Sequence, residues 1–298
     1  MKTDYQSLLK PEILNSIKGL ELIARVVVEG YFSGLNTSRR VGAGMEFSQY
    51  RSYEPGDDLR LLDWKMLARS SRYYIKQSEI DTNIAVKFIV DASNSMQHSD
   101  GELSKMDYAR FLVATLGYLA KHQGDAIGLF GLNENQLYAL HPKVQTQHLN
   151  RFLHQLLEIK SEGKWPSSRT STDALHDFRH KELIVFVTDM YESDGELTSF
   201  VNRLKTKRNE VIVIHLITDN ELLMNYKGAV TLEDLETHKR VKVDASAVRE
   251  SYVAAMNEHL EKTKSDMLHN GIDYTMFNIK DNIGEVINLF LKQRLTLL

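Results

Sequence analysis

The sequence contains no cysteine among its 298 residues, so disulfide bonds, zinc–thiolate sites and thiol catalysis are all excluded. It contains only four prolines, and no proline-rich or glycine-rich stretch marks a linker between domains. Net charge is also small, because 37 Lys and Arg residues face 40 Asp and Glu residues. The resulting formal charge of −3 gives no general attraction toward nucleic acid or an anionic membrane.

Long hydrophobic runs are missing as well. The two most apolar stretches are LELIARVVVEGYF, which is interrupted by Arg25 and Glu29, and FLVATLGYLA, which ends at Lys121. Neither reaches the ~18–20 residues that a membrane-spanning helix requires. The N-terminal residues lack the apolar segment of a signal peptide. The sequence therefore predicts a soluble, cytoplasmic protein without a membrane span.

From about residue 83 onward, the hydrophobic pattern predicts strands that alternate with helices. The strands have no polar face, which is typical of a mostly parallel sheet that is covered on both sides. We therefore predict a three-layer Rossmann-like α/β fold, with a hairpin inserted at 226–244. The expected strands are 84–90, 125–132, 136–140, 183–188, 210–217 and 272–279, and the expected helices are 105–121, 147–159, 173–178, 196–207, 247–270 and 283–291.

The N-terminal part of the chain has a different pattern. Residues 11–29 have helical hydrophobic spacing that begins at a proline, whereas 31–80 are irregular and rich in Arg, Asp, Tyr and Gly. We therefore expect two parts. Residues 1–82 form an N-terminal helix and an irregular or β extension that packs on the main domain, and 83–298 form the α/β domain.

Small oxygen-bearing side chains follow one of the buried strands. The stretch FIVDASNSM ends the strand 84–90 and presents Asp91, Ser93 and Ser95, and the strand 183–188 is followed by Asp189. Ligands of open α/β sheets bind outside the carboxyl ends of the strands, where both aspartates are expected to lie. Hard cations such as Mg²⁺ take oxygen ligands. The pattern therefore predicts a site for Mg²⁺ or Mn²⁺.

These residues also resemble the von Willebrand factor type A domain. In that fold, an Asp-x-Ser-x-Ser motif, a downstream threonine and an aspartate after a later strand form the metal-ion-dependent adhesion site. The resemblance implies that Ser93 and Ser95 bind the ion through their hydroxyls, while Asp91 and Asp189 bind it or orient its waters. Met190 departs from the family, which often has glycine at this position.

The threonine ligand would come from the loop RTSTDAL. Thr170 and Thr172 both lie in this loop, and their spacing leaves both open. We prefer Thr170.

The segment Gly42–Glu79 resembles the bacterial family called domain of unknown function 58. Those proteins join this segment to a type A-like domain and are often encoded beside MoxR-type AAA+ ATPases. The resemblance implies a protein partner, either such an ATPase or one of its clients. The residues that carry it are Glu46-Phe47, Arg51-x-Tyr53, Gly56-Asp57-Asp58-x-Arg60, Asp63-Trp64 and Ala68-Arg69.

Charged residues in this segment allow two interpretations. They can form a buried ion-pair network that holds the extension on the main domain, or they can supply paired catalytic carboxylates. Adjacent aspartates after Pro-Gly are common in turns, and arginine binds carboxylates in a bidentate manner. We therefore favour the structural network, whose members are Arg51, Asp57, Asp58, Arg60 and Asp63.

The sequence as a whole predicts a non-enzymatic, metal-dependent adaptor that binds another protein. The alternative is a Mg²⁺-dependent hydrolase that uses Asp91 and Asp189. Such an enzyme needs a base or nucleophile beside the ion. The residues near the motif that offer one are Asn94, His98, Tyr191 and Glu192.

Two further classes of enzyme are disfavoured. His176 and His180 have the spacing of a zinc-protease helix, but Asp177 stands where such a helix has glutamate. The sequence also has no Walker lysine motif, so we do not expect ATP hydrolysis by this chain.

Overall fold

The computed structural model describes residues 9–38, 49–52, 69, 73–77, 84–145, 147–166, 175, 181–192 and 195–297. The chain divides into two units, one formed by residues 1–32 with 83–298 and the other by 33–82. Among the described residues, no helix combines the length and the hydrophobicity needed to cross a lipid bilayer.

A six-stranded sheet organises the larger unit. Its strands run in the order β12-β9-β8-β3-β6-β7, and all neighbours pair in parallel except β6 and β7. Numbered along the chain, this order is 3-2-1-4-5-6, that of a doubly wound Rossmann-like sheet. The predicted mostly parallel α/β sheet is therefore confirmed. Its strands are β3 (Ala85–Asp91), β6 (Ala126–Leu132), β7 (Leu137–Lys143), β8 (Glu182–Thr188), β9 (Asn209–Ile217) and β12 (Asp273–Asn278).

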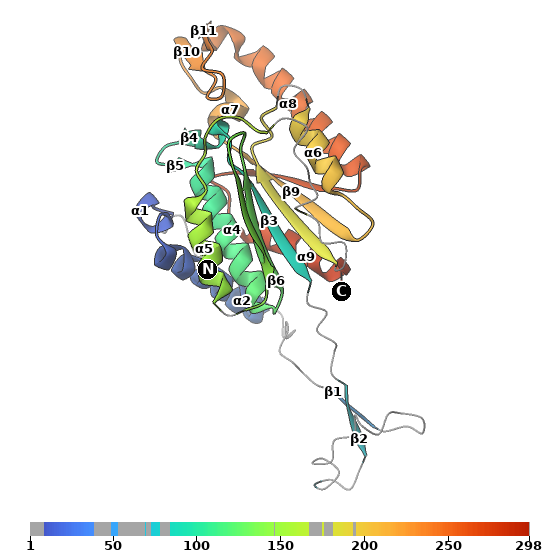
Figure 1. The fold of residues 1–298 in the computed structure, drawn as a ribbon. Helices are drawn as coiled ribbons and strands as arrows, with labels where there is room; N and C mark the ends of the chain where they lie inside the picture. The colour runs from blue at the N-terminus through green and yellow to red at the C-terminus, as the bar shows by residue number, and fades with distance from the viewer. Residues whose placement is uncertain are drawn as a thin grey trace. The chain divides into compact units, whose positions relative to one another are not determined.

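Helices cover both faces of this sheet (Figure 1). Alternate residues of β3 enter different cores, because side chains in a strand point to opposite faces. Phe88 lies in the core on one face and Ile89 in the core on the other. One face packs against α4 (Lys105–His122), α5 (His148–Glu158) and α9 (Gly284–Leu297), and the other packs against α6 (Glu196–Leu204) and α8 (Ala245–His269).

Helix α4 is fixed at its start and along its length. Ser104 and Asp107 form a capping box, in which each side chain satisfies a backbone N–H that the first turn leaves free. Further along, Gly117 allows α5 to approach closely, because a Cβ atom at this position would lie 2.7 Å from the Phe152 ring. At its start, the Lys105 N–H donates to the His98 carbonyl at 3.0 Å, which places this end of α4 beside the segment that follows β3 and carries the predicted metal ligands.

The N-terminal helix is part of the larger unit. It consists of α1 (Pro11–Leu14) and α2 (Ile17–Ser38), rather than the single predicted helix over 11–29. Leu20, Ile23 and Val27 are buried in the same core as α4 and α9. The first half of α2 therefore contributes to the hydrophobic core of the α/β domain.

Short elements near the ends of the strands were not predicted. They are the 3₁₀ helix η3 (Asn94–Gln97), the two-residue strands β4 (Ser99–Asp100) and β5 (Leu103–Ser104), and the helix α7 (Asp219–Leu223). The predicted hairpin is confirmed as β10 (Ala229–Glu233) paired with β11 (Arg240–Asp244). The predicted helix 173–178 lies outside the described residues, apart from Leu175.

The smaller unit contains one described hairpin, in which β1 (Gln49–Ser52) pairs with β2 (Tyr74–Gln77) in an antiparallel register. Arg51 lies opposite Ile75 in this hairpin. The other members of the predicted ion-pair network, Asp57, Asp58, Arg60 and Asp63, lie outside the described residues. The network therefore stays a prediction.

Replacing Leu20 by alanine tests whether α2 belongs to the core of the α/β domain. Leu20 is fully buried, so we expect Leu20→Ala to lower the free energy of unfolding by about 2–5 kcal/mol. Leu22→Ala is the matched control, because Leu22 lies on the same helix and is 57% exposed. Urea unfolding measures both variants. Equal stabilities would show that α2 does not pack on this domain in solution.

Candidate metal centre

Four of the residues predicted from the sequence meet at the carboxyl ends of β3 and β8. The Ser93 hydroxyl donates to Asp91 Oδ1 at 2.7 Å, and the Ser93 and Ser95 hydroxyl oxygens lie 2.9 Å apart. The Ser95 hydroxyl also lies 3.1 Å from Asp189 Oδ1, to which it donates. A continuous row of oxygen atoms therefore connects the two aspartates.

Asp91 is fully buried and has only neutral donors around it. Its Oδ1 accepts from the Ser93 backbone N–H and hydroxyl, and its Oδ2 accepts from the Thr188 hydroxyl at 2.7 Å. Burial, and then the charge of Asp189, raise the pKa of the Asp91 carboxyl from 3.8 to about 7. Among the described residues, no cationic side chain pairs with Asp91.

Asp189 is buried too, but it has a cationic partner. The Lys105 ammonium donates to Asp189 Oδ2 at 2.9 Å and to Glu221 Oε1 at 2.5 Å, and its side chain is only 2% exposed. Burial opposes ionisation of Asp189, yet Lys105 keeps the pKa of its carboxyl below the ordinary value. Because Lys105 holds Oδ2, the other oxygen, Oδ1, faces Ser95.

A histidine supports the backbone of Asp189. The His215 ring bonds to the Asp189 backbone, and its Nδ1 lies 2.5 Å from the Tyr274 hydroxyl. Burial, followed by the charge of Lys105, lowers the pKa of His215 to about 3, so the ring is neutral. A neutral ring can accept a hydrogen bond from the Tyr274 hydroxyl at Nδ1 and donate one from Nε2 to the Asp189 carbonyl. This arrangement fixes the end of β8.

The turn after Asp189 accommodates Met190 in a strained conformation. Its φ angle is 51°, in the left-handed region that favours glycine. The Met190 side chain is nevertheless buried in the core beside α6, and its N–H donates to the Thr188 hydroxyl. Met190 therefore adopts the left-handed turn that glycine, which often occupies this position in the type A family, would adopt without strain.

The oxygen atoms fit the geometry of a hexacoordinate hard cation. Mg²⁺ binds oxygen at 2.0–2.1 Å, so neighbouring ligands of its octahedron are about 3 Å apart. The Ser93–Ser95 and Ser95–Asp189 oxygen pairs are separated by 2.9 and 3.1 Å. Among the described residues, no group of three or more His, Cys, Asp or Glu side chains is arranged to hold a metal ion, so a site here would depend on the serine hydroxyls beside Asp91 and Asp189. The predicted threonine ligands, Thr170 and Thr172, lie outside the described residues.

Three charged residues near the site were missed by the sequence analysis. The sequence pattern predicts Lys105 only as the start of a helix, and Glu221 belongs to the unpredicted helix α7. Glu236 lies in the turn of the β10–β11 hairpin, where it interacts with Ser95 and with the charges of Asp91 and Asp189. Burial, followed by these two charges, raises the pKa of Glu236 to about 7. No local sequence signal indicates these contacts, because each joins segments that are distant in the chain.

Three of the four candidate catalytic groups have structural partners. Asn94 accepts from Gln97, and the pKa of Tyr191 is raised to about 12 by burial and by a hydrogen bond to Asp234. His98 differs, because its Nε2 is buried and has no hydrogen-bond partner among the described residues.

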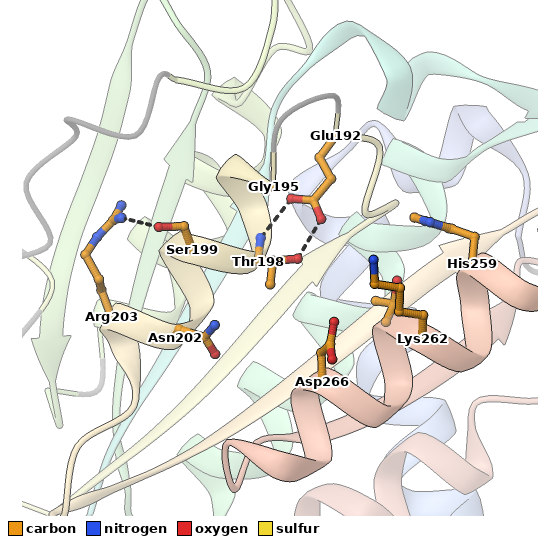
Figure 2. A pocket seen from close by; sticks show the side chains of 10 residues that line it. Glu192, Gly195, Thr198, Ser199, Asn202, Arg203, His259, Lys262 and Asp266 are labelled. Carbon is orange, nitrogen blue, oxygen red and sulfur yellow. Dashed lines mark hydrogen bonds between the residues drawn. The ribbon is translucent and has the colours of Figure 1, made fainter.

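The fourth candidate, Glu192, caps helix α6. It accepts from the Thr198 N–H at 2.9 Å and from the Thr198 hydroxyl at 2.5 Å (Figure 2). Glu192 also borders a hollow of about 730 Å³, which is lined by residues of α6 and α8. Arg203, Lys262 and Asp266 give this hollow charges of both signs, so it indicates no single class of ligand.

A family model named "Protein of unknown function DUF58" matches residues 49–262. The chain belongs to the DUF58 family. Two mycobacterial relatives are the uncharacterised proteins Rv1480 of Mycobacterium tuberculosis and Mb1516 of Mycobacterium bovis. Each is 23% identical over 254 residues, which cover 84% of this chain and 79% of the relative.

Solved structures similar to this DUF58 protein include BatB from Bacteroides thetaiotaomicron and the SpRpn10 VWA domain. BatB is 14% identical, with a TM-score of 0.44, over 70% of this chain and 100% of BatB. The VWA domain is 13% identical, with a TM-score of 0.40, over 70% of this chain and 95% of that domain. The predicted three-layer Rossmann-like α/β fold is confirmed by the strand order and by the helices that pack on both faces of the sheet.

Removing the Lys105 ammonium tests the buried ion pairs of this DUF58 protein. Lys105→Met leaves Asp189 and Glu221 without their shared cation, so we expect the free energy of unfolding to fall by about 3–5 kcal/mol. Urea unfolding in metal-free buffer measures the change. Lys205→Met is the control, because the partly exposed Lys205–Glu210 pair contributes about 1 kcal/mol or less. Equal losses would contradict a structural role for Lys105.

Proposed function

We propose that this DUF58 protein is a protein-binding module whose binding depends on a divalent cation, Mg²⁺ or Mn²⁺. The observation that carries this proposal is the buried Asp91 carboxylate, which has neutral donors but no described cationic partner. A buried carboxylate must be protonated, paired or bound to a metal. A cation beside Ser93 and Ser95 would neutralise Asp91 directly.

The chemistry of the donor set favours a hard cation. Hydroxyl and carboxylate oxygens are the ligands that Mg²⁺ and Mn²⁺ prefer. Ser93, Ser95 and Asp189 Oδ1 would hold the ion, and Asp91 would bind it or orient its waters. When bound, the ion would attract a carboxylate of another protein to a remaining coordination position. The family resemblance implies one further ligand, a threonine of the loop RTSTDAL, and we prefer Thr170 over Thr172 for this role.

The identity of the partner rests on the family resemblance alone. It favours a MoxR-type AAA+ ATPase, or one of its clients, as the protein that supplies this carboxylate. A function of this class is an adaptor in the assembly or maturation of a complex. The physical part of the proposal requires only that the partner present an Asp or Glu to the metal edge of the sheet.

Metal binding is tested by thermal unfolding. A cation that binds only the folded state stabilises it by mass action, so the wild-type melting temperature should rise with Mg²⁺ concentration. We expect Ser93→Ala with Ser95→Ala to abolish this rise. The control is Ser246→Ala with Ser251→Ala, which removes two exposed hydroxyls from α8. A double mutant at 93 and 95 that responds to Mg²⁺ as the wild type does would contradict the proposed ligands.

Partner binding is tested with a purified MoxR-type AAA+ ATPase. Biolayer interferometry should detect binding in Mg²⁺, and EDTA should weaken it about as much as Asp91→Ala does, because both remove the metal bridge. Equal binding in Mg²⁺ and EDTA would exclude that bridge. Mg²⁺-dependent turnover of a phosphoester, lost in Asp189→Asn, would instead support the hydrolase alternative, for which His98 is the available base.

A further inference from the structure

We propose that Glu236 is an intramolecular ligand of the metal ion, so the β10–β11 hairpin supplies a carboxylate that a binding partner must displace. This inference rests on the proposed metal site and extends it. It assigns a position in the coordination sphere to a residue of the chain itself, and it gives the hairpin a function.

The turn of the hairpin is rigidly organised around Asp234. Asp234 Oδ1 accepts from the N–H groups of Glu236 and Thr237 at 2.9 and 3.1 Å, and Oδ2 accepts from the Thr237 hydroxyl at 2.5 Å. Below the turn, five residue pairs from Ala229↔Asp244 to Glu233↔Arg240 keep β10 and β11 in register. The backbone of Glu236 is therefore fixed with respect to both strands.

Two contacts attach this turn to the metal centre. The Tyr191 hydroxyl bonds to Asp234, and Tyr191 lies two residues after Asp189. The Glu236 carboxylate reaches Ser95, one of the two proposed hydroxyl ligands, and lies within the electrostatic influence of Asp91 and Asp189. Its Oε1 is buried and has no hydrogen-bond partner among the described residues. The turn therefore brings a carboxylate that has an oxygen without a partner up to one of the proposed ligands of the ion.

Charge explains why this placement favours a cation. Glu236, Asp91 and Asp189 are like charges, and bringing them together in a buried site is unfavourable without a compensating positive charge. Lys105 is already shared between Asp189 and Glu221. A divalent ion between Ser95 and Glu236 would turn this repulsion into attraction and would give Glu236 Oε1 a partner.

A second glutamate of the hairpin provides an internal comparison. Glu233 lies on the exposed side, where Arg240 Nε donates to its carboxylate at 2.7 Å and His238 lies at 3.2 Å. These hydrogen bonds keep the pKa of Glu233 below its ordinary value. Within this hairpin, Glu233 pairs with the basic side chains of Arg240 and His238, whereas Glu236 lies near the acidic side chains of Asp91 and Asp189. This difference is expected if the partner of Glu236 is a metal ion.

The base of the hairpin is held by contacts that do not involve the metal centre. The Ala245 N–H donates to the Gly228 carbonyl, and Arg249 donates to the carbonyls of Met224 and Tyr226. The turn itself contacts the metal centre through Tyr191 and Ser95. A partner carboxylate could therefore replace Glu236 at the ion while the base of the hairpin stays in place.

The test compares Glu236→Gln with Glu233→Gln in the full chain. Each substitution removes one charge from the same hairpin, but only Glu236→Gln removes the proposed ligand. Isothermal titration of Mg²⁺ into metal-free protein should show affinity weakened on the order of tenfold for Glu236→Gln and unchanged for Glu233→Gln. Hydrogen exchange should show that Mg²⁺ protects the amides of residues 234–239 in the wild type and not in Glu236→Gln.

The outcomes separate this inference from the proposed metal site. Suppose that Mg²⁺ binds the wild type, that Ser93→Ala with Ser95→Ala abolishes binding, and that Glu236→Gln binds as tightly as the wild type. Then the metal site stands and the role of Glu236 is wrong. Absence of Mg²⁺ and Mn²⁺ binding by the wild type would overturn both. Weakened binding with loss of protection at 234–239 would support both.

Discussion

Burial of the Asp91 carboxylate is the constraint around which the carboxyl edge of the sheet is arranged. Asp91 ends the central strand β3, between β6 and β8, where both faces of the sheet are covered by helices. Water cannot solvate this charge, so protein donors must do so. Ser93 and Thr188 satisfy its hydrogen bonds but contribute no positive charge. The proposed cation is the partner that would complete this neutralisation.

The two aspartates of the site have different electrostatic environments. Lys105 keeps Asp189 ionised, whereas burial favours the protonated form of Asp91. An ion bound between them would meet one carboxylate that is already charged and one that must release a proton. Glu236 would add a third carboxylate from the hairpin. The affinity of the site for the ion would then reflect two competitions. Lys105 and protons compete with the ion for the carboxylate oxygens, and Glu236 and a partner carboxylate compete for a coordination position on the ion.

Much of the fold could be predicted from the sequence, because buried parallel strands are continuous apolar runs such as LIVFVT. The oxygen ligands could also be predicted, since Asp91 and Asp189 directly follow such strands. Lys105, Glu221 and Glu236 could not, because their roles depend on contacts between segments that are 84 or more residues apart or that belong to the inserted hairpin. Local patterns reveal which residues end a strand, but not which distant side chain approaches them.

The proposed function depends most directly on the binding of a divalent cation among Ser93, Ser95 and Asp189. Anomalous diffraction from crystals grown with Mn²⁺ locates such an ion without reference to any partner. We predict a strong anomalous peak within bonding distance of the Ser93 and Ser95 hydroxyl oxygens, with Glu236 beside it. A structure with these side chains well ordered at saturating Mn²⁺, and no peak between them, would contradict the account.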